Sequence, residues 1–437
     1  MTAKKVIAAV VGVAVVAGAG FIGYKTWHNA SQKHDFIAPP SLSSTGKTAL
    51  ERGEYLARAG DCVACHTAEG GKPYAGGMGL DTPFGKIMVS NITPDKETGI
   101  GGWSDQQFID AVRNGKGIHG ENLYPAMPYN VYSKVSDADL KDMKAYLDTI
   151  PAVHNQVAKT DLPFPFNIRQ MMWGWNLLFF DAAPFKTNPQ RSSQWNRGAY
   201  LVDGLGHCTS CHTPKNLLGA DRSGKYLQGG ELQGWLAPEI TGNRRQGIGR
   251  WTPDQVVSYL ETGSNSHVVA AGPMGEAIDN SLQYMNKDDL RAMAEYLQSL
   301  PGSRDNSVPL TAAQETMQRG GKIYQDNCMA CHKADGSGVE GMIPALAGNS
   351  GIQAPSATNV LRALMLGGQG VATHSNPTAA AMPEFAWKLD DQQLSDVATF
   401  IRNGWGNQAP AVNTQDVANA RKSLSASNPL NNPRNTQ

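Results

Sequence analysis

All six cysteines of this 437-residue chain fall into one short pattern, in which two cysteines three positions apart are followed directly by a histidine. The three copies are Cys62-Val-Ala-Cys65-His66, Cys208-Thr-Ser-Cys211-His212 and Cys328-Met-Ala-Cys331-His332. With six cysteines and ten histidines in 437 residues, chance gives this pattern about three times in ten thousand per cysteine. Three accidental copies are therefore excluded, and one repeated chemistry accounts for every cysteine.

The spacing is typical of covalent c-type haem attachment. Two thiols on one helical turn can each form a thioether with a haem vinyl group, and the adjacent imidazole is then placed to bind the iron. We therefore predict three haem c groups. The predicted attachment points are Cys62, Cys65, Cys208, Cys211, Cys328 and Cys331, and the predicted proximal iron ligands are His66, His212 and His332.

Three other uses of paired cysteines explain less of the pattern. A zinc site with four thiolate ligands would use two pairs, strand the third and give the histidines no role. A thioredoxin-like redox pair belongs in a βαβ setting, which the sequence does not show. Three structural disulfides would suit an oxidising compartment but would also leave the histidines unexplained.

The sequence around each pattern is itself repeated, which predicts three tandem units. Arg52-Gly53-Glu54-Tyr55-Leu56 matches Arg197-Gly198-Ala199-Tyr200-Leu201, and Arg319-Gly320-Gly321 is a looser third copy. Further along, Ile92-Thr93 matches Ile240-Thr241. The units are expected over 45–155, 191–303 and 308–410, with an apolar linker over 156–190 and a polar, loosely ordered tail over 411–437.

Each unit closes with apolar residues spaced three or four apart, the pattern of an amphipathic helix. The expected capping pairs are Ser136 with Asp139, Asn286 with Asp289, and Asp390 with Gln393. We assign these apolar faces to packing rather than to haem contact. They contain Leu140, Met143 and Leu147; Leu290, Met293 and Leu297; and Leu394, Val397 and Ile401. The predicted fold is mainly α, with three tandem haem domains of the class I cytochrome c type.

An electron-transfer haem usually has a second protein ligand on its iron, often a methionine. A methionine beside a proline precedes each closing helix by roughly ten residues, on a loop that the proline stiffens. The predicted sixth ligands are Met127, Met274 and Met382. The competing ligands in the same regions are His119, His267 and His374. Four other methionines are less suitable, because Met285 falls at the start of a closing helix and Met78, Met88 and Met342 lie too close to the haem motif; a lone methionine is more often a core residue than a ligand.

Each proximal histidine also needs an acceptor for its second ring nitrogen. We expect backbone carbonyls to fill this role, from Pro83 in the first unit, Pro238 in the second and Pro344 in the third.

The first 28 residues are expected to be a signal anchor or a signal peptide. Lys4 and Lys5 precede an uncharged run over 6–24, which is just long enough to span a bilayer. Ala17-Gly18-Ala19 resembles a cleavage site, but the apolar run continues beyond it, so we favour the uncleaved anchor. A buried helix of a soluble domain is the third interpretation. Both membrane interpretations place the rest of the chain on the periplasmic side.

The charge balance limits the class of partner. Lys plus Arg and Asp plus Glu are 38 each, so the formal net charge is zero. A basic surface for nucleic acid is therefore not expected, and no nucleic-acid partner is predicted.

With these motifs in place, the chain resembles the triheme cytochrome c subunits of bacterial membrane-bound dehydrogenases, over residues 45–410. The resemblance implies an electron-transfer subunit on the periplasmic side of the bacterial inner membrane. It also implies a separate catalytic subunit, a quinoprotein, flavoprotein or molybdenum enzyme, that oxidises an alcohol, a sugar or aldonic acid, or an aldehyde. Electrons would then pass to ubiquinone or a terminal oxidase. No catalytic residue is predicted on this chain.

Two alternative functions belong to other classes of protein. A self-standing multihaem enzyme, such as a cytochrome peroxidase or a thiosulfate dehydrogenase, would need a haem with an open or unusual sixth position. A freely diffusing carrier would conflict with the expected anchor.

The apolar linker also leaves three interpretations: packing between units, binding of a partner subunit, or contact with lipid or quinone.

Overall fold

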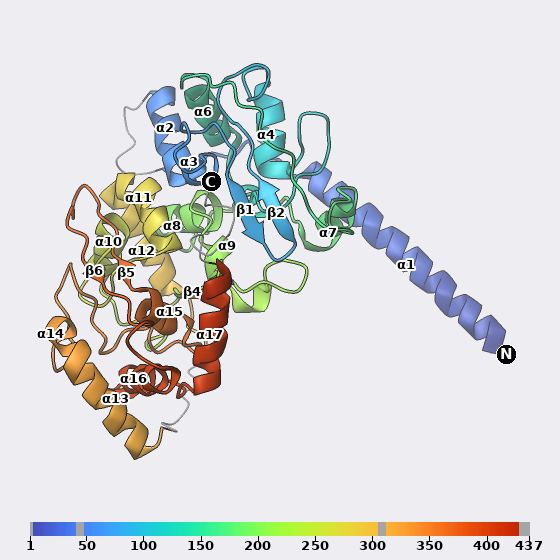
Figure 1. Cartoon of the computed structure of the whole chain (residues 1–437). Helices are drawn as coiled ribbons and strands as arrows, with labels where there is room; N and C mark the ends of the chain where they lie inside the picture. Colours follow the sequence, from blue (N-terminus) through green and yellow to red (C-terminus); the bar gives the residue numbers. More distant parts are fainter. Residues whose placement is uncertain (1–2, 41–47, 305–311, 428–437) are drawn as a thin grey trace.

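The computed structural model describes residues 3–40, 48–304 and 312–427, and within them the side chains of 16–424. One long helix, α1 (Ala3–Ser31), projects from a body of mostly short helices (Figure 1). The described part of the body also contains three two-stranded antiparallel sheets. The predicted mainly helical fold is confirmed.

Each of the predicted units, and the linker between the first two, contains helices of the structure. The first unit contains α2 (Ala49–Ala59), α3 (Cys62–Cys65), β1 (Gly79–Thr82), β2 (Gly85–Met88), α4 (Asp105–Asn114), α5 (Tyr129–Tyr132) and α6 (Asp137–Leu147). The linker contains α7 (Met171–Phe179).

The second unit has more elements than the first, including a one-turn π-helix, η1. It contains α8 (Ser193–Tyr200), η1 (Leu201–Leu205), α9 (Thr209–His212), η2 (Ser223–Lys225), β3 (Gln228–Leu232), β4 (Trp235–Glu239), α10 (Pro253–Thr262), α11 (Pro273–Asn280), η3 (Leu282–Tyr284) and α12 (Lys287–Ser299). The third contains α13 (Gln314–Asn327), α14 (Met329–His332), α15 (Thr358–Leu366), β5 (Gly368–Gln369), β6 (Ala381–Met382) and α16 (Asp391–Asn403), and α17 (Thr414–Ser427) follows it.

The first long helix of each unit crosses the last one at a glycine. A Cβ on Gly53 of α2 would lie 1.9 Å from the carbonyl oxygen of Asp142 on α6, and one on Gly198 would lie 1.9 Å from that of Ala292 on α12. A Cβ on Gly320 of α13 would lie 2.2 Å from the same atom of Asp396 on α16. Only glycine permits such an approach, which explains the repeated Arg-Gly step.

The arginine before each of these glycines pairs with an aspartate on the last helix. Arg52 Nε lies 2.7 Å from Asp142 Oδ2, and Arg319 Nε lies 2.6 Å from Asp396 Oδ2. In the second unit Arg197 donates from both Nε and Nη2 to Asp289. Asp289 lies about one helical turn before Ala292, the residue that Gly198 contacts. These ion pairs hold the two helices at the crossing point in one orientation.

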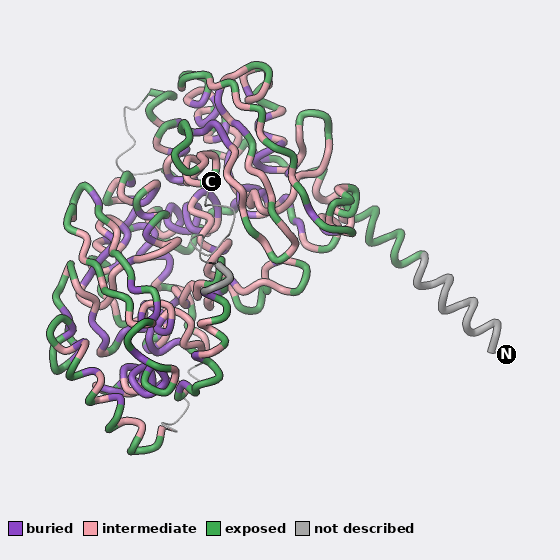
Figure 2. Tube along the Cα trace, viewed as in Figure 1, coloured by how far each residue is buried: buried purple, intermediate pink, exposed green. Residues whose placement is uncertain are grey.

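The predicted helix caps and apolar faces of the closing helices are confirmed. Ser136, Asn286 and Asp390 each accept a hydrogen bond from the backbone three residues later. The apolar faces of α6, α12 and α16 are buried, with Leu140, Leu290 and Leu394 fully excluded from solvent. The purple core in Figure 2 follows these helices.

The first two units share one hydrophobic core, whereas the third has its own. The shared core contains residues from both units, among them Leu140 and Tyr132 of the first and Leu205 and Leu290 of the second. The core of the third unit is formed around α15, α16 and α17. Since burial of apolar surface is the main stabilising contribution, the first two units are expected to fold as one body.

The linker packs between these two units, as one of the three interpretations predicted. Trp175 of α7 packs edge-on against Tyr129 of the first unit, and its Nε1 donates to Leu218 O of the second at 2.9 Å. Met171, Trp173 and Leu178 of α7 remain exposed.

The expectation of a loosely ordered tail is wrong for residues 414–427, which form α17. Val417 and Leu424 are buried in the third core, so a few apolar residues in a polar segment suffice to dock it. Arg421 Nε also donates to Asp391 Oδ1 at 2.9 Å, next to the start of α16. The remainder of the predicted tail, 428–437, lies outside the described residues.

The predicted anchor over 1–28 falls on α1, and the side chains of its first 15 residues lie outside those described. α1 is fixed to the body near its carboxyl end. Lys25 Nζ donates to Phe180 O at 3.1 Å, and His28 Nε2 lies 3.1 Å from Asp181 Oδ1. Among the described residues, no helix is long and apolar enough to cross a membrane.

Replacing Gly198 by alanine is expected to lower the free energy of unfolding by about 2–3 kcal/mol, because the new methyl group would force α8 away from α12. Denaturant unfolding followed by circular dichroism measures the change. The control is Gly224→Ala, where a Cβ meets nothing within 4 Å, and a change within about 0.5 kcal/mol is expected. Equal stability of the two variants would contradict the assigned crossing.

Candidate haem-binding sites

Each Cys-x-x-Cys-His pattern forms a single helical turn shortly after the first helix of its unit. The histidine backbone N–H donates to the carbonyl of the first cysteine in all three turns, at 3.0 Å for His66 and 2.9 Å for His212 and His332. No two of the six cysteines form a disulfide. Each motif therefore presents two cysteines and one imidazole on a turn that is closed by the same backbone hydrogen bond.

Each proximal histidine is oriented by a backbone carbonyl. The Nδ1 atoms of His66 and His212 lie 2.7 Å from Ser90 O and Pro238 O, and His332 Nδ1 lies 3.1 Å from Pro344 O. Because a carbonyl can only accept, Nδ1 carries the proton and Nε2 keeps the lone pair that a metal requires.

Two of the three predicted acceptors, Pro238 and Pro344, are confirmed, and Pro83 is wrong. Pro83 lies in the turn between β1 and β2, whereas Ser90 follows β2. The repeat contains the signal that identifies Ser90. Aligned on Ile92-Thr93 and Ile240-Thr241, Ser90 occupies the position of Pro238.

Burial shifts the pKa of the three motif histidines and of the first cysteine in each of the first two motifs. It lowers the pKa of His66, His212 and His332, which favours the unprotonated imidazole that can bind iron. Burial also raises the pKa of the Cys62 and Cys208 thiols to about 12. The residues thus fit a covalently held haem, with neutral thiols beside a neutral imidazole.

The predicted methionine ligands lie in three different backbone settings. Met127 is in a turn before α5, and Met382 is in β6. Met274 is on the first turn of α11 rather than on a loop, because Pro273 begins a helix there. Met127 and Met274 pack against the shared core, as Cys62 and Cys208 also do. Met382 packs against the third core, which contains Cys328. Their role as iron ligands stays a prediction.

The other histidines near the motifs are exposed or contact aromatic rings. His119 and His374 are exposed. His267 stacks on Trp251, with their ring centroids 5.8 Å apart and an angle of 9° between the planes. His207 is the residue before Cys208, and its ring meets Tyr132 edge-on.

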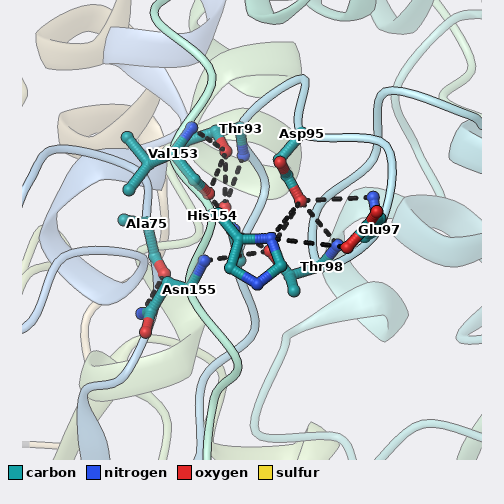
Figure 3. A network of polar contacts seen from close by, with 9 residues as sticks. Ala75, Thr93, Asp95, Glu97, Thr98, Val153, His154 and Asn155 are labelled. Atoms are coloured by element: carbon teal, nitrogen blue, oxygen red, sulfur yellow. Dashed lines mark hydrogen bonds and ion pairs between the residues drawn. The ribbon is translucent and has the colours of Figure 1, made fainter.

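The loop that carries the acceptor of the first unit is held by the chain that follows α6. Asn91 Nδ2 donates to Val153 O at 2.8 Å, and Val153 N donates to Thr93 Oγ1 at 3.1 Å. Asn155 Nδ2 donates to Ala75 O at 2.7 Å, as Figure 3 shows. The end of the unit therefore fixes the loop whose Ser90 carbonyl orients His66.

The same connection exists in the second unit, but it is centred on a buried carboxylate. Glu239 accepts hydrogen bonds from Ser303 N at 2.8 Å, Ser303 Oγ at 2.6 Å and Asn243 Nδ2 at 3.2 Å, and also from the hydroxyl of Thr241. Glu239 follows Pro238, the acceptor for His212. Glu239 was not among the predicted site residues, although it is next to the predicted acceptor.

The first two motifs meet across the boundary between their units. Asp61 and His207, which precede Cys62 and Cys208, both have left-handed backbone conformations, with φ of 52° and 36°. Tyr132 Oη donates to Gly60 O at 3.0 Å while its ring contacts His207. Burial raises the pKa of Asp61 to about 8, and its Oδ1 has no hydrogen-bond partner among the described residues.

Glu239→Ala is expected to reduce the free energy of unfolding by about 3 kcal/mol, since it leaves several buried donors without an acceptor. Denaturant unfolding measures the loss, and the absorption spectrum of the haem-loaded protein shows whether His212 is displaced. The exposed Glu231 in the hairpin of the same unit provides the control. A Glu231→Ala variant that loses as much stability would contradict the role assigned to Glu239.

Known proteins resemble this chain over most of its length. The Cytochrome c family model matches residues 50–151 and 317–405. The chain is 41% identical to the gluconate 2-dehydrogenase cytochrome c subunit of Pantoea cypripedii, over 85% of this chain and 89% of the relative. It is 37% identical to the cytochrome c subunit of the quinone-linked alcohol dehydrogenase of Gluconobacter oxydans, over 85% of this chain and 82% of the relative.

A third relative, one of the subunits of the nicotinate dehydrogenase of Pseudomonas putida, is 41% identical over 86% of this chain. The chain spans about a third of the length of that protein, since the match covers 32% of it. The chain belongs to the family of cytochrome c subunits of dehydrogenases.

Proposed function

We propose that this chain is the triheme electron-transfer subunit of a periplasmic dehydrogenase complex at the bacterial inner membrane. The observation that carries the proposal is the threefold Cys-x-x-Cys-His turn, with each histidine oriented by a backbone carbonyl at 2.7–3.1 Å. Three such turns provide three equivalent places for haem c.

The chain's own residues have distinct roles in this function. The paired cysteines would tether each haem, and His66, His212 and His332 would bind iron through Nε2. Met127, Met274 and Met382 would each supply the second protein ligand of an iron, which favours a high reduction potential. Bound haem supplies a one-electron redox centre in each unit. The shared core of the first two units holds two of these sites in one body.

Substrate oxidation is assigned to a partner. The relatives are named for gluconate, alcohol and nicotinate dehydrogenases, which favours a quinoprotein, flavoprotein or molybdenum enzyme as the catalytic subunit. We propose an alcohol, a sugar or aldonic acid, or an aldehyde as the electron donor. Ubiquinone or a terminal oxidase is the proposed acceptor. The basic start and apolar run over 6–24 support a location on the periplasmic side of the membrane.

The ligand assignment is tested in the third unit, which has its own core. Met382→Leu removes a thioether of similar volume, so one of the three haems is expected to become high spin and its midpoint potential to fall. Absorption spectroscopy and a potentiometric titration detect both changes. The control is Met342→Leu in the same unit, at a half-exposed position. Identical spectra for the two variants would rule out Met382 as a ligand.

The role in a complex is tested with the chain purified from its native membranes in mild detergent. A catalytic subunit is expected to copurify, and one of ethanol, gluconate, nicotinate or an aldehyde is expected to reduce the haem of the complex. The isolated chain serves as the control and should not be reduced by that substrate. Substrate or peroxide turnover by the isolated chain would instead favour a self-standing enzyme.

A further inference from the structure

A cavity of about 630 Å³ lies at the base of α1, where that helix meets α7 and the end of α4. The contact between α1 and α7 is visible in Figure 1. The residues predicted to hold haem all belong to the described part of the chain, and none of them lines this cavity. The electron-transfer role therefore leaves the cavity without a function.

The lining is positively charged. Four basic side chains face two acidic ones: Lys25, Lys33, Arg113 and Lys116, with Asp35 and Asp137. Arg113 and Asp137 form an ion pair and compensate each other. Lys25 Nζ and Lys116 Nζ instead contact neutral oxygens, Phe180 O at 3.1 Å and Asn122 Oδ1 at 2.6 Å. The excess positive charge favours an anionic ligand.

Two buried nitrogen atoms of the lining residues have no hydrogen-bond partner within the described chain, His34 Nε2 and Arg113 Nε. His34 is 6% exposed and Arg113 is 5% exposed, and both residues line the cavity. Buried polar atoms in proteins are nearly always paired. An oxyanion in the cavity would supply the missing acceptor for Arg113.

The surroundings of the cavity are apolar and aromatic. Trp173 and Leu177 of α7 line it, and Trp173 is exposed. Nearby on α7 and α1, Leu178 and Trp27 are also exposed. Exposed tryptophans beside lysines are typical of the interface between a bilayer and water. The same site thus offers cations for a head group and apolar surface for acyl chains.

We propose that this cavity binds the phosphate head group of an anionic phospholipid, whose acyl chains lie against the exposed apolar side chains of α7. The proposal rests on the proposed location at the membrane, and it does not depend on electron transfer. Lipid binding would fix the orientation of the shared core relative to the bilayer through α1 and α7.

The test uses the haem-loaded full chain in a non-ionic detergent and monomeric dihexanoyl lipids, so that bilayer partition does not contribute. Calorimetric titration compares dihexanoylphosphatidylglycerol with dihexanoylphosphatidylcholine and inorganic phosphate. The pocket variant is Lys25→Gln, Lys33→Gln and Lys116→Gln combined. The matched control removes the same charge from exposed positions outside the lining, as Lys72→Gln, Lys322→Gln and Lys422→Gln combined.

The wild-type chain and the control are expected to bind phosphatidylglycerol at least about tenfold more tightly than the pocket variant does. Phosphatidylcholine and inorganic phosphate should both bind at least about tenfold more weakly. Equal binding of phosphatidylcholine, equal binding of inorganic phosphate, or unchanged binding by the pocket variant would each overturn the proposal. Haem reduction by the dehydrogenase complex is measured separately, so the two proposals can fail independently.

Discussion

The crossing of the first and last helix is the contact on which each unit depends. At Gly53 and Gly198 the backbone carbonyl of the partner helix lies 1.9 Å from where a Cβ would be, so any side chain there would separate the helices. The preceding arginine adds an ion pair to an aspartate on the last helix. Because the haem motif lies only a few residues after the first helix, this contact limits where the motif lies relative to the end of the unit.

The proximal loops show how one geometric requirement is met with different residues. The histidine always donates to a carbonyl, which comes from Ser90, Pro238 or Pro344. The chain after the last helix secures the loop in both of the first two units. Asn91 and Thr93 do so in one, and the Glu239 carboxylate does so in the other. A backbone acceptor is independent of side-chain identity, which allows this variation.

The helix caps and the apolar faces of the closing helices could be predicted because their signals are local. Each cysteine pattern, each capping pair and each apolar face of a closing helix extends over only a few turns of the chain. Ser90 was missed because any residue can offer a carbonyl, and only the alignment of the repeats distinguishes its position. Met274 lies on a helix because Pro273 is favourable at the first position of a helix. A Gly-Pro pair in the sequence does not distinguish such a helix start from a loop. α17 packs on the third unit through two buried residues in an otherwise polar segment. Two apolar residues are too weak a pattern to predict this contact from the sequence.

The sequence by itself determined the chemistry of each unit, since the covalent spacing of two thiols and an imidazole and the 3.6-residue helical period act over short distances. Only the tertiary structure decided which units share a core, that Trp175 links the first two, and that α1, α4 and α7 enclose a basic cavity. These features arise from surfaces that lie far apart in the sequence, whose contact depends on packing in three dimensions.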